Sequence, residues 1–207
     1  MKTLIAIPCM DMVHTPFMKS LLGLDRVGDT RFAISCSSLI YDARNTLAKQ
    51  AVTENYDRVL WLDSDMDFNP DLLKMLSKDM DEGRDLVSGI YFKRRAPVKP
   101  VIYKEVGYFH HEDEVTPIAV SYEDYPRDSI FPIEGCGFGG CLVSADLIKK
   151  VADKYGLPFS PIMGFGEDLS FCMRAKTIGA EMFCDSSVKL GHVGLGTITE
   201  DTFLQTR

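Results

Sequence analysis

The sequence predicts an α/β protein whose central sheet is mixed, mostly parallel and covered by helices on both faces. Two features of residues 1–93 carry this prediction. Short apolar runs of strand length alternate with segments of helical periodicity, and turn or polar residues separate them. Strand–helix–strand units of this kind cross over in a right-handed sense, which places the strands parallel and the helices on both faces of the sheet.

Four apolar runs predict the strands of this half. They cover residues 3–8, 30–36, 57–63 and 85–92. The first run ends at Pro8, which has no amide proton for a continuing sheet. The third contains "VLWL", expected to be a rigid buried strand, and it leads directly into three acids, Asp63, Asp65 and Asp67.

Helical spacing predicts the three helices between these strands. They cover residues 15–24, 41–55 and 70–83. Pro16 lies near the start of the first helix, where proline is favoured. The second helix gathers Ala43, Leu47 and similar residues on one face. For the third, Asn69 is the expected cap and Pro70 lies just inside.

The pattern changes after Lys93. Residues 94–132 begin basic and broken by prolines and then become aromatic and polar, which predicts short antiparallel strands and a mobile flap. Residues 133–207 return to order, with a glycine-rich turn, a strand, a helix over 145–156 and a final cluster of motifs. One domain, 1–207, is expected, with residues 1–93 and 133–207 as its two halves and 94–132 as the segment between them.

Composition excludes several classes of protein. The formal net charge of −7 gives no support for duplex nucleic acid as a partner. No window has the roughly 18 apolar residues of a membrane span, and the first apolar run resembles a strand rather than a signal peptide. We expect a cytoplasmic protein, in the host cytoplasm if a phage encodes it. The six cysteines form no C-x-x-C pair and are expected to be reduced thiols, the alternative being a zinc or disulfide framework.

The first motif is Asp63-Ser64-Asp65 at the carboxyl end of the third strand, where parallel sheets place their ligands. Residues i and i+2 of an extended chain point to the same side, so these two carboxylates can hold Mg²⁺ or Mn²⁺. The alternative is a solvated acidic turn before the next helix. Asp67 is expected to have a loop or capping role, or to make an outer-shell contact at the site.

The second motif, Glu167-Asp168, opens a predicted helix. The helix dipole favours acids there and would keep them ionised near neutral pH, so an acid facing a cleft could take a proton from a hydroxyl. The alternative is that they are ordinary acids of a first helical turn. His192, between glycines, is either a further metal ligand or a structural histidine.

Three other features are more ambiguous. The turn "GCGFGGC", residues 135–141, fits neither a P-loop nor a dinucleotide fingerprint; it is either a tight turn or a backbone wall of a ligand pocket. Arg44 could pair with a phosphate or with Asp63, or form a surface ion pair. The segment 109–115, "FHHEDEV", is metal-like in composition but is expected to be a solvated loop.

The order of these motifs resembles that in the GT-A glycosyltransferases, which have a Rossmann-like fold, and in particular that in family-2-like nucleotide-sugar transferases of bacteria and phages. The resemblance implies that residues 1–93 form a nucleotide-sugar-binding half and residues 133–207 an acceptor and catalytic half. The resemblance implies that Asp65 is the direct metal ligand, that Asp63 contacts the ribose or the metal shell, and that His192 is a late metal ligand. Asp168 matches the general base of the E-D motif, next to Glu167. The resemblance also implies a donor site, whose expected residues are Pro8, Cys9, Asp11, Arg44, Asp63, Ser64, Gly139 and Gly140.

The implied function is metal-dependent transfer of a single sugar from a nucleotide-diphosphate sugar, with UDP-sugars favoured and Mn²⁺ or Mg²⁺ as cofactor. The acceptor is a hydroxyl of a saccharide, a protein or a modified nucleobase. Arg94 and Arg95 of the flap could close over the diphosphate. A sugar-nucleotide-forming nucleotidyltransferase is disfavoured because an early G-x-G-T-R-like loop is missing, and a catalytically silent binding module is the other alternative. If the enzyme retains anomeric configuration, Asp168 would position the substrate rather than act as the base.

Overall fold

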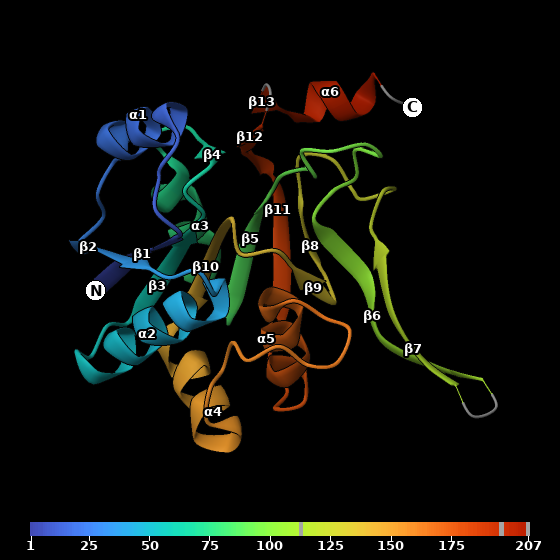
Figure 1. Cartoon of the computed structure of the whole chain (residues 1–207). Coiled ribbons are helices and arrows are strands. Elements are labelled where there is room, and N and C mark those ends of the chain that lie inside the picture. Colours follow the sequence, from blue (N-terminus) through green and yellow to red (C-terminus); the bar gives the residue numbers. More distant parts are fainter. Residues whose placement is uncertain (112–113, 195–196, 206–207) are drawn as a thin grey trace.

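A seven-stranded sheet forms the centre of the computed structural model, which describes residues 1–111, 114–194 and 197–205 (Figure 1). Its strands, in spatial order, are β2 (Asp29–Cys36), β1 (Lys2–Cys9), β3 (Arg58–Leu62), β10 (Gly140–Ser144), β5 (Leu86–Ile90), β11 (Met182–Lys189) and β8 (Ile130–Pro132). The pairs β1–β2, β1–β3 and β5–β11 are parallel, whereas β10 and β8 are antiparallel to their neighbours. Five strands therefore share one direction, which confirms the mixed, mostly parallel sheet.

Helices cover both faces of this sheet, as the sequence predicts. They are α1 (Thr15–Gly23), α2 (Ile40–Thr53), α3 (Leu72–Met80), α4 (Ala145–Tyr155), α5 (Glu167–Lys176) and α6 (Glu200–Leu204). Alternate strand residues point to opposite faces. In β3, Trp61 packs in the buried cluster that includes α2, α4 and α5, while Leu60 packs in the cluster with α1 and α3.

Two small sheets flank the central one. One orders β13 (Thr197–Ile198), β12 (Gly191–Val193) and β4 (Met66–Asp67), and it joins the end of the chain to the acids after β3. The other orders β7 (Glu114–Ser121), β6 (Ile102–His111) and β9 (Gly135–Cys136). The β6–β7 hairpin projects from the body of the molecule (Figure 1).

Several expectations about local structure need correction. The predicted antiparallel strands of the flap are present but are not short, because β6 has 10 residues and β7 has 8. The segment 109–115 is not a loop at its ends: Phe109 to His111 lie in β6 and Glu114 and Val115 in β7, while residues 112–113 lie outside the described residues. These strands are largely exposed, so they lack the one-sided apolar pattern by which a strand is recognised.

The start of α3 also differs from expectation. The helix begins at Leu72 with Asp71 as its flanking residue, and no side chain caps it. Asn69 instead accepts a hydrogen bond through its main-chain oxygen from the Leu72 amide, at 3.2 Å, in the preceding turn. Asp67 caps no helix either; it lies in β4 and accepts a hydrogen bond of 2.8 Å from Ser20 of α1. Within the described ranges, none of the helices is both long and apolar enough to span a membrane.

A pair of acids between α3 and β11 couples the fold to pH. Burial and the neighbouring Asp185 carboxyl raise the pKa of Asp79 to about 6. With both groups ionised, the buried Oδ2 of Asp79 has no hydrogen-bond donor among the described residues. A proton on one carboxyl supplies that donor, so the folded protein binds a proton that the unfolded chain releases near pH 3.8.

We therefore expect stability to fall as the pH rises from about 4 to about 6, because the folded state binds more protons than the unfolded state across that window. Asp79→Asn supplies a permanent donor, so its melting temperature should exceed that of the unmodified protein at pH 7.5 and vary less over the window. Thermal melts across this pH range measure the effect. Asp153→Asn, at an exposed ion pair on α4, is the matched control. If the melting temperatures of the Asp79 variant and the unmodified protein changed with pH in the same way, this account would be contradicted.

Candidate functional site

The turn after β3 is held from two sides. The Asp63 amide donates to the Gly139 carbonyl at 3.4 Å, and the Ser64 carbonyl accepts from the His14 amide at 2.9 Å. The chain then enters β4, where Met66 pairs with His192 of β12, and the Val193 amide donates to the Asp65 carbonyl at 2.8 Å. This pairing brings a histidine from near the end of the chain to the acids that follow β3.

Arg44 of α2 joins the two acidic motifs. Its side chain is 2% exposed; Nη2 lies 2.8 Å from Asp63 Oδ1, and Nε lies 3.1 Å from Glu167 Oε1. The rings of Trp61 and Phe138 flank the guanidinium at 5.7 and 5.6 Å. Burial alone would lower the pKa of Arg44, but the charges of Asp63 and Glu167 outweigh it and raise that pKa. The pairing with Asp63 is confirmed, and the alternative of a surface ion pair is wrong.

Asp65 faces His192 and Arg94. Its Oδ2 lies 3.4 Å from His192 Nε2, and it forms an ion pair with Arg94 Nη1. Burial would raise the pKa of Asp65, but the contacts with His192 and Arg94 lower it. Burial would lower the pKa of His192, and its bonds to Asp65 and to the Phe92 carbonyl raise it instead.

The donor set around Asp65 fits a hard divalent metal ion with open coordination positions. His192 Nδ1 lies 2.8 Å from the Phe92 carbonyl, and this bond fixes the ring with Nε2 toward Asp65. A metal-ligating histidine is oriented in this way by an outer partner. Mg²⁺ and Mn²⁺ commonly take one or two protein groups plus water and phosphate oxygens. Asp65 and His192 can supply those protein groups.

Asp63 does not complete a three-residue metal set. Across residues 1–111, 114–194 and 197–205, no group of three or more His, Cys, Asp or Glu side chains is close enough to hold a metal ion. The physical reason is Arg44, which draws the Asp63 carboxylate toward α2. Asp63 and Asp65 thus have different partners in this structure, and a metal ion bound by both carboxylates stays a prediction.

Glu167 and Asp168 occupy the first turn of α5. Glu167 binds Arg44, whereas Asp168 accepts a hydrogen bond from the Leu169 amide at 2.7 Å and faces the cleft. Burial, and then the charge of Glu167, raise the pKa of Asp168 to about 6. The prediction that the helix start keeps this acid ionised near neutral pH is consistent with a pKa of about 6, although burial moves the pKa upward.

Asp63, Asp168 and His192 border a cleft of about 490 Å³. It is lined by Asp63, Tyr91, Lys93, Arg94, Arg95, Ala96, Pro97, Val101, Asp168 and His192. Three consecutive basic residues thus share the lining of one opening with two acids and a histidine. Tyr91 was not anticipated; its ring lies 5.7 Å from that of His192, and its hydroxyl accepts from the Gly139 amide at 3.2 Å. Its position just after β5, at the same edge of the sheet, is the signal that could have found it.

The other predicted donor residues lie outside the described lining of this cleft. Pro8 and Cys9 are buried at the end of β1, and Asp11 is exposed beyond it. A Cβ on Gly140 would come within 2.4 Å of Leu190, and one on Gly139 within 3.0 Å of Met66 and Tyr91. A side chain at either position would therefore crowd packed side chains of the protein itself. A role for these five residues or for Ser64 in binding a donor stays a prediction.

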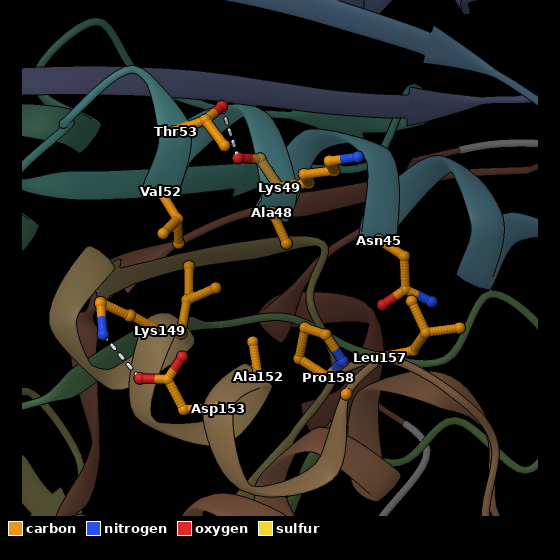
Figure 2. A pocket seen from close by; sticks show the side chains of 12 residues that line it. Asn45, Ala48, Lys49, Val52, Thr53, Lys149, Ala152, Asp153, Leu157 and Pro158 are labelled. Atoms are coloured by element: carbon orange, nitrogen blue, oxygen red, sulfur yellow. Dashed lines mark hydrogen bonds and ion pairs between the residues drawn. The ribbon is translucent and has the colours of Figure 1, made fainter.

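Figure 2 shows a second cavity, of about 200 Å³, between α2 and α4. Its walls are mostly aliphatic, with Ala48, Val52 and Ala152 among them. The acid at its rim, Asp153, is bound to Lys149 at 2.6 Å, and Asn45 accepts from the Phe159 amide at 2.9 Å. None of the sequence-predicted site residues lines it, so the candidate chemistry lies in the cleft at the sheet edge.

Known structures with the same arrangement of elements decide the fold. The chain has the GT-A fold. A197 from STIV aligns with a TM-score of 0.69 at 21% identity, over 94% of this chain and 86% of A197. GalNAc-T7 with UDP, GalNAc and Mn²⁺ aligns with a TM-score of 0.60 at 8% identity, over 93% of this chain and 43% of that protein.

A third structure with the GT-A fold is S. aureus TarS 1–349 in complex with UDP-GlcNAc. It aligns with a TM-score of 0.55 at 18% identity, over 89% of this chain and 56% of TarS 1–349. No family model and no curated protein matches the sequence. The likeness therefore concerns the fold, and the argument for function depends on the cleft.

Replacing Arg44 tests the central ion pairs. Arg44→Met leaves Asp63 and Glu167 without their cation, and breaking a buried pair from one side costs about 3 kcal/mol or more. We expect urea denaturation to show this loss in the free energy of unfolding. Arg31→Met removes the exposed pair with Asp29 and should cost far less, because solvent screens that pair. Equal losses for the two variants would contradict a structural role for Arg44.

Proposed function

We propose that this protein is a metal-dependent glycosyltransferase that moves a single sugar from a UDP-sugar to an acceptor hydroxyl. The observation that carries the proposal is the cleft at the carboxyl edge of the sheet, whose lining includes His192, three basic side chains and Asp168. Asp65 contacts two of these lining residues, His192 and Arg94. The shared fold with GalNAc-T7, crystallised with UDP and Mn²⁺, and with TarS, crystallised with UDP-GlcNAc, supports this substrate class.

The donor side of the proposal uses charge. Asp65 and His192 would hold Mn²⁺ or Mg²⁺, and the ion would offset the negative charge that develops on the leaving diphosphate. Lys93, Arg94 and Arg95 supply a basic wall of the cleft that suits phosphate oxygens. Arg94, which binds Asp65 in this structure, would exchange that carboxylate for the diphosphate when the donor enters.

The acceptor side uses Asp168. Its pKa of about 6 leaves it ionised at neutral pH yet basic enough to accept a proton. The acceptor oxygen forms a bond to the anomeric carbon, the bond from that carbon to the diphosphate oxygen breaks, and the hydroxyl proton passes to Asp168. Glu167 would act as a positioning residue, since its carboxylate is bound to Arg44.

The alternatives differ in what they release. A nucleotidyltransferase would join a sugar phosphate to a nucleoside triphosphate and release pyrophosphate from the triphosphate. A binding module would bind a UDP-sugar and leave it intact. Incubating the protein with UDP-sugars, Mn²⁺ and candidate acceptors should release UDP in proportion to the glycosylated product. Pyrophosphate release from a parallel incubation with UTP and sugar phosphates, with no UDP release from the first mixture, would overturn the proposal in favour of a nucleotidyltransferase. Binding without turnover of any sugar tested would overturn it in favour of a binding module.

Asp65→Asn tests the metal role. Because the amide carries no charge, Mn²⁺-dependent affinity for UDP should fall by about 100-fold or more, given that even outer-shell partners of metal ligands contribute 10–100-fold. Isothermal titration calorimetry with and without Mn²⁺ measures the difference. Asp67→Asn, two residues away but bonded to Ser20, should bind UDP as the unmodified protein does. Undiminished Mn²⁺-dependent binding by the Asp65 variant would remove this residue from the metal site.

Asp168→Asn tests the proton acceptor. Transfer should slow by ~10²-fold or more while UDP-sugar affinity is unchanged, because the base acts on the acceptor hydroxyl. In the unmodified protein the rate should drop as the pH falls through about 6, where Asp168 becomes protonated. Asp146→Asn, which also alters an acid in the first turn of a helix but outside the cleft, is the control. Full activity of the Asp168 variant would exclude this residue as the base.

A further inference from the structure

Two cysteines meet at the ends of neighbouring strands, outside the cleft. Cys9 is the last residue of β1 and Cys36 the last residue of β2, and the parallel register places them side by side. Their Sγ atoms are 3.3 Å apart. The Ser37 amide also donates to the Cys9 carbonyl at 3.1 Å, so hydrogen bonding between the two chain segments continues past the strand ends.

The backbone positions suit a disulfide. Neighbouring strands are about 4.8 Å apart in the hydrogen-bonding direction. Disulfides form when the Cα atoms are roughly 4.4–6.8 Å apart. The sulfur atoms are 3.3 Å apart, and a bond of about 2.05 Å requires each to move by roughly 0.6 Å. Side-chain rotation can supply such a shift without moving the sheet.

The two thiols differ in access. Cys36 is exposed, whereas Cys9 is 4% exposed. Burial, and then the hydrogen bond with Cys36, raise the pKa of the Cys9 thiol to about 11, so Cys9 is a poor first nucleophile. The other four cysteines, Cys136, Cys141, Cys172 and Cys184, are buried. Cys36 is thus the thiol that a dissolved oxidant can reach, and Cys9 is the thiol placed to resolve the product.

We propose that Cys9 and Cys36 form a reversible redox pair that a small disulfide, such as oxidised glutathione, converts to an intramolecular disulfide. The Cys36 thiolate attacks one glutathione sulfur and its partner leaves as a thiolate, which gives a mixed disulfide. The Cys9 sulfur then attacks the Cys36 sulfur, and the second glutathione leaves with the Cys9 proton. Two protein thiols are oxidised, and one glutathione disulfide is reduced to two thiols.

The bond would join the start of the first loop to the end of β2. That loop continues to His14, whose amide holds the Ser64 carbonyl in the turn between the site acids. Oxidation would therefore cross-link the segment that borders the candidate site. A cross-link between residues 9 and 36 also restricts the unfolded chain, so the oxidised form should melt at a higher temperature than the reduced form.

The experiment uses the full chain, reduced and then freed of reductant. After incubation with oxidised glutathione and quenching in acid, two of the six thiols should disappear together, and the intact mass should show loss of two hydrogens without added glutathione. Peptide mapping should join Cys9 to Cys36, the melting temperature should rise, and dithiothreitol should reverse all three changes.

Variants assign the steps. Cys9→Ser should stop at a mixed disulfide on Cys36, Cys36→Ser should keep all its remaining thiols, and Cys184→Ala should form the bond as the unmodified protein does. A glutathione adduct that persists on Cys36 in the unmodified protein would overturn the proposal. A disulfide between other cysteines would also overturn it. So would a folded protein that keeps all six thiols under conditions that oxidise the thiols of the denatured chain. None of these readouts depends on sugar transfer.

Discussion

The buried guanidinium of Arg44 is the interaction on which the candidate site depends. An isolated charge in the interior costs several kcal/mol, so the fold must provide carboxylates to it. It takes one from the turn after β3 and one from the first turn of α5, which are far apart in the sequence. The two acidic motifs are consequently fixed relative to each other, and Asp168, next to Glu167, is directed into the cleft.

This constraint divides the acids that follow β3. As neighbours on an extended chain, Asp63 and Asp65 would be equivalent, and two like charges would repel each other. Arg44 holds Asp63 on the α2 side, while the pairing of β4 with β12 gives Asp65 a histidine. The acids are thus neutralised by different partners, one of them a permanent buried cation. Asp67 takes a third direction, toward Ser20 of α1.

The sequence predicted the features that local patterns determine. The apolar run "VLWL" and the acids after it placed Asp63 and Asp65 at a sheet edge, and Glu167 and Asp168 at a helix start, because strand ends and first turns are short-range features. It did not predict that Arg44 would be buried, since that depends on Trp61, Phe138 and Glu167, which come from distant parts of the chain. The insertion of β10 between β3 and β5 likewise depends on long-range pairing that no local period encodes. The β6–β7 hairpin pairs neighbouring segments, but its strands are largely exposed and so lack a one-sided apolar pattern.

The remaining charges at the edge explain why a ligand could enter there. Arg44 is 2% exposed and held by two carboxylates, whereas Arg94 is 43% exposed and lies in the basic segment 93–95 beside the cleft. Arg94 is held by one carboxylate and nearly half of its side chain is in water, so its guanidinium stays solvated when it leaves Asp65. Displacing Arg44 would instead leave buried carboxylates unpaired. The edge thus combines a buried cation that maintains its geometry with a partly exposed one beside Asp65 and His192, and under the proposed function it is the second that a ligand would replace.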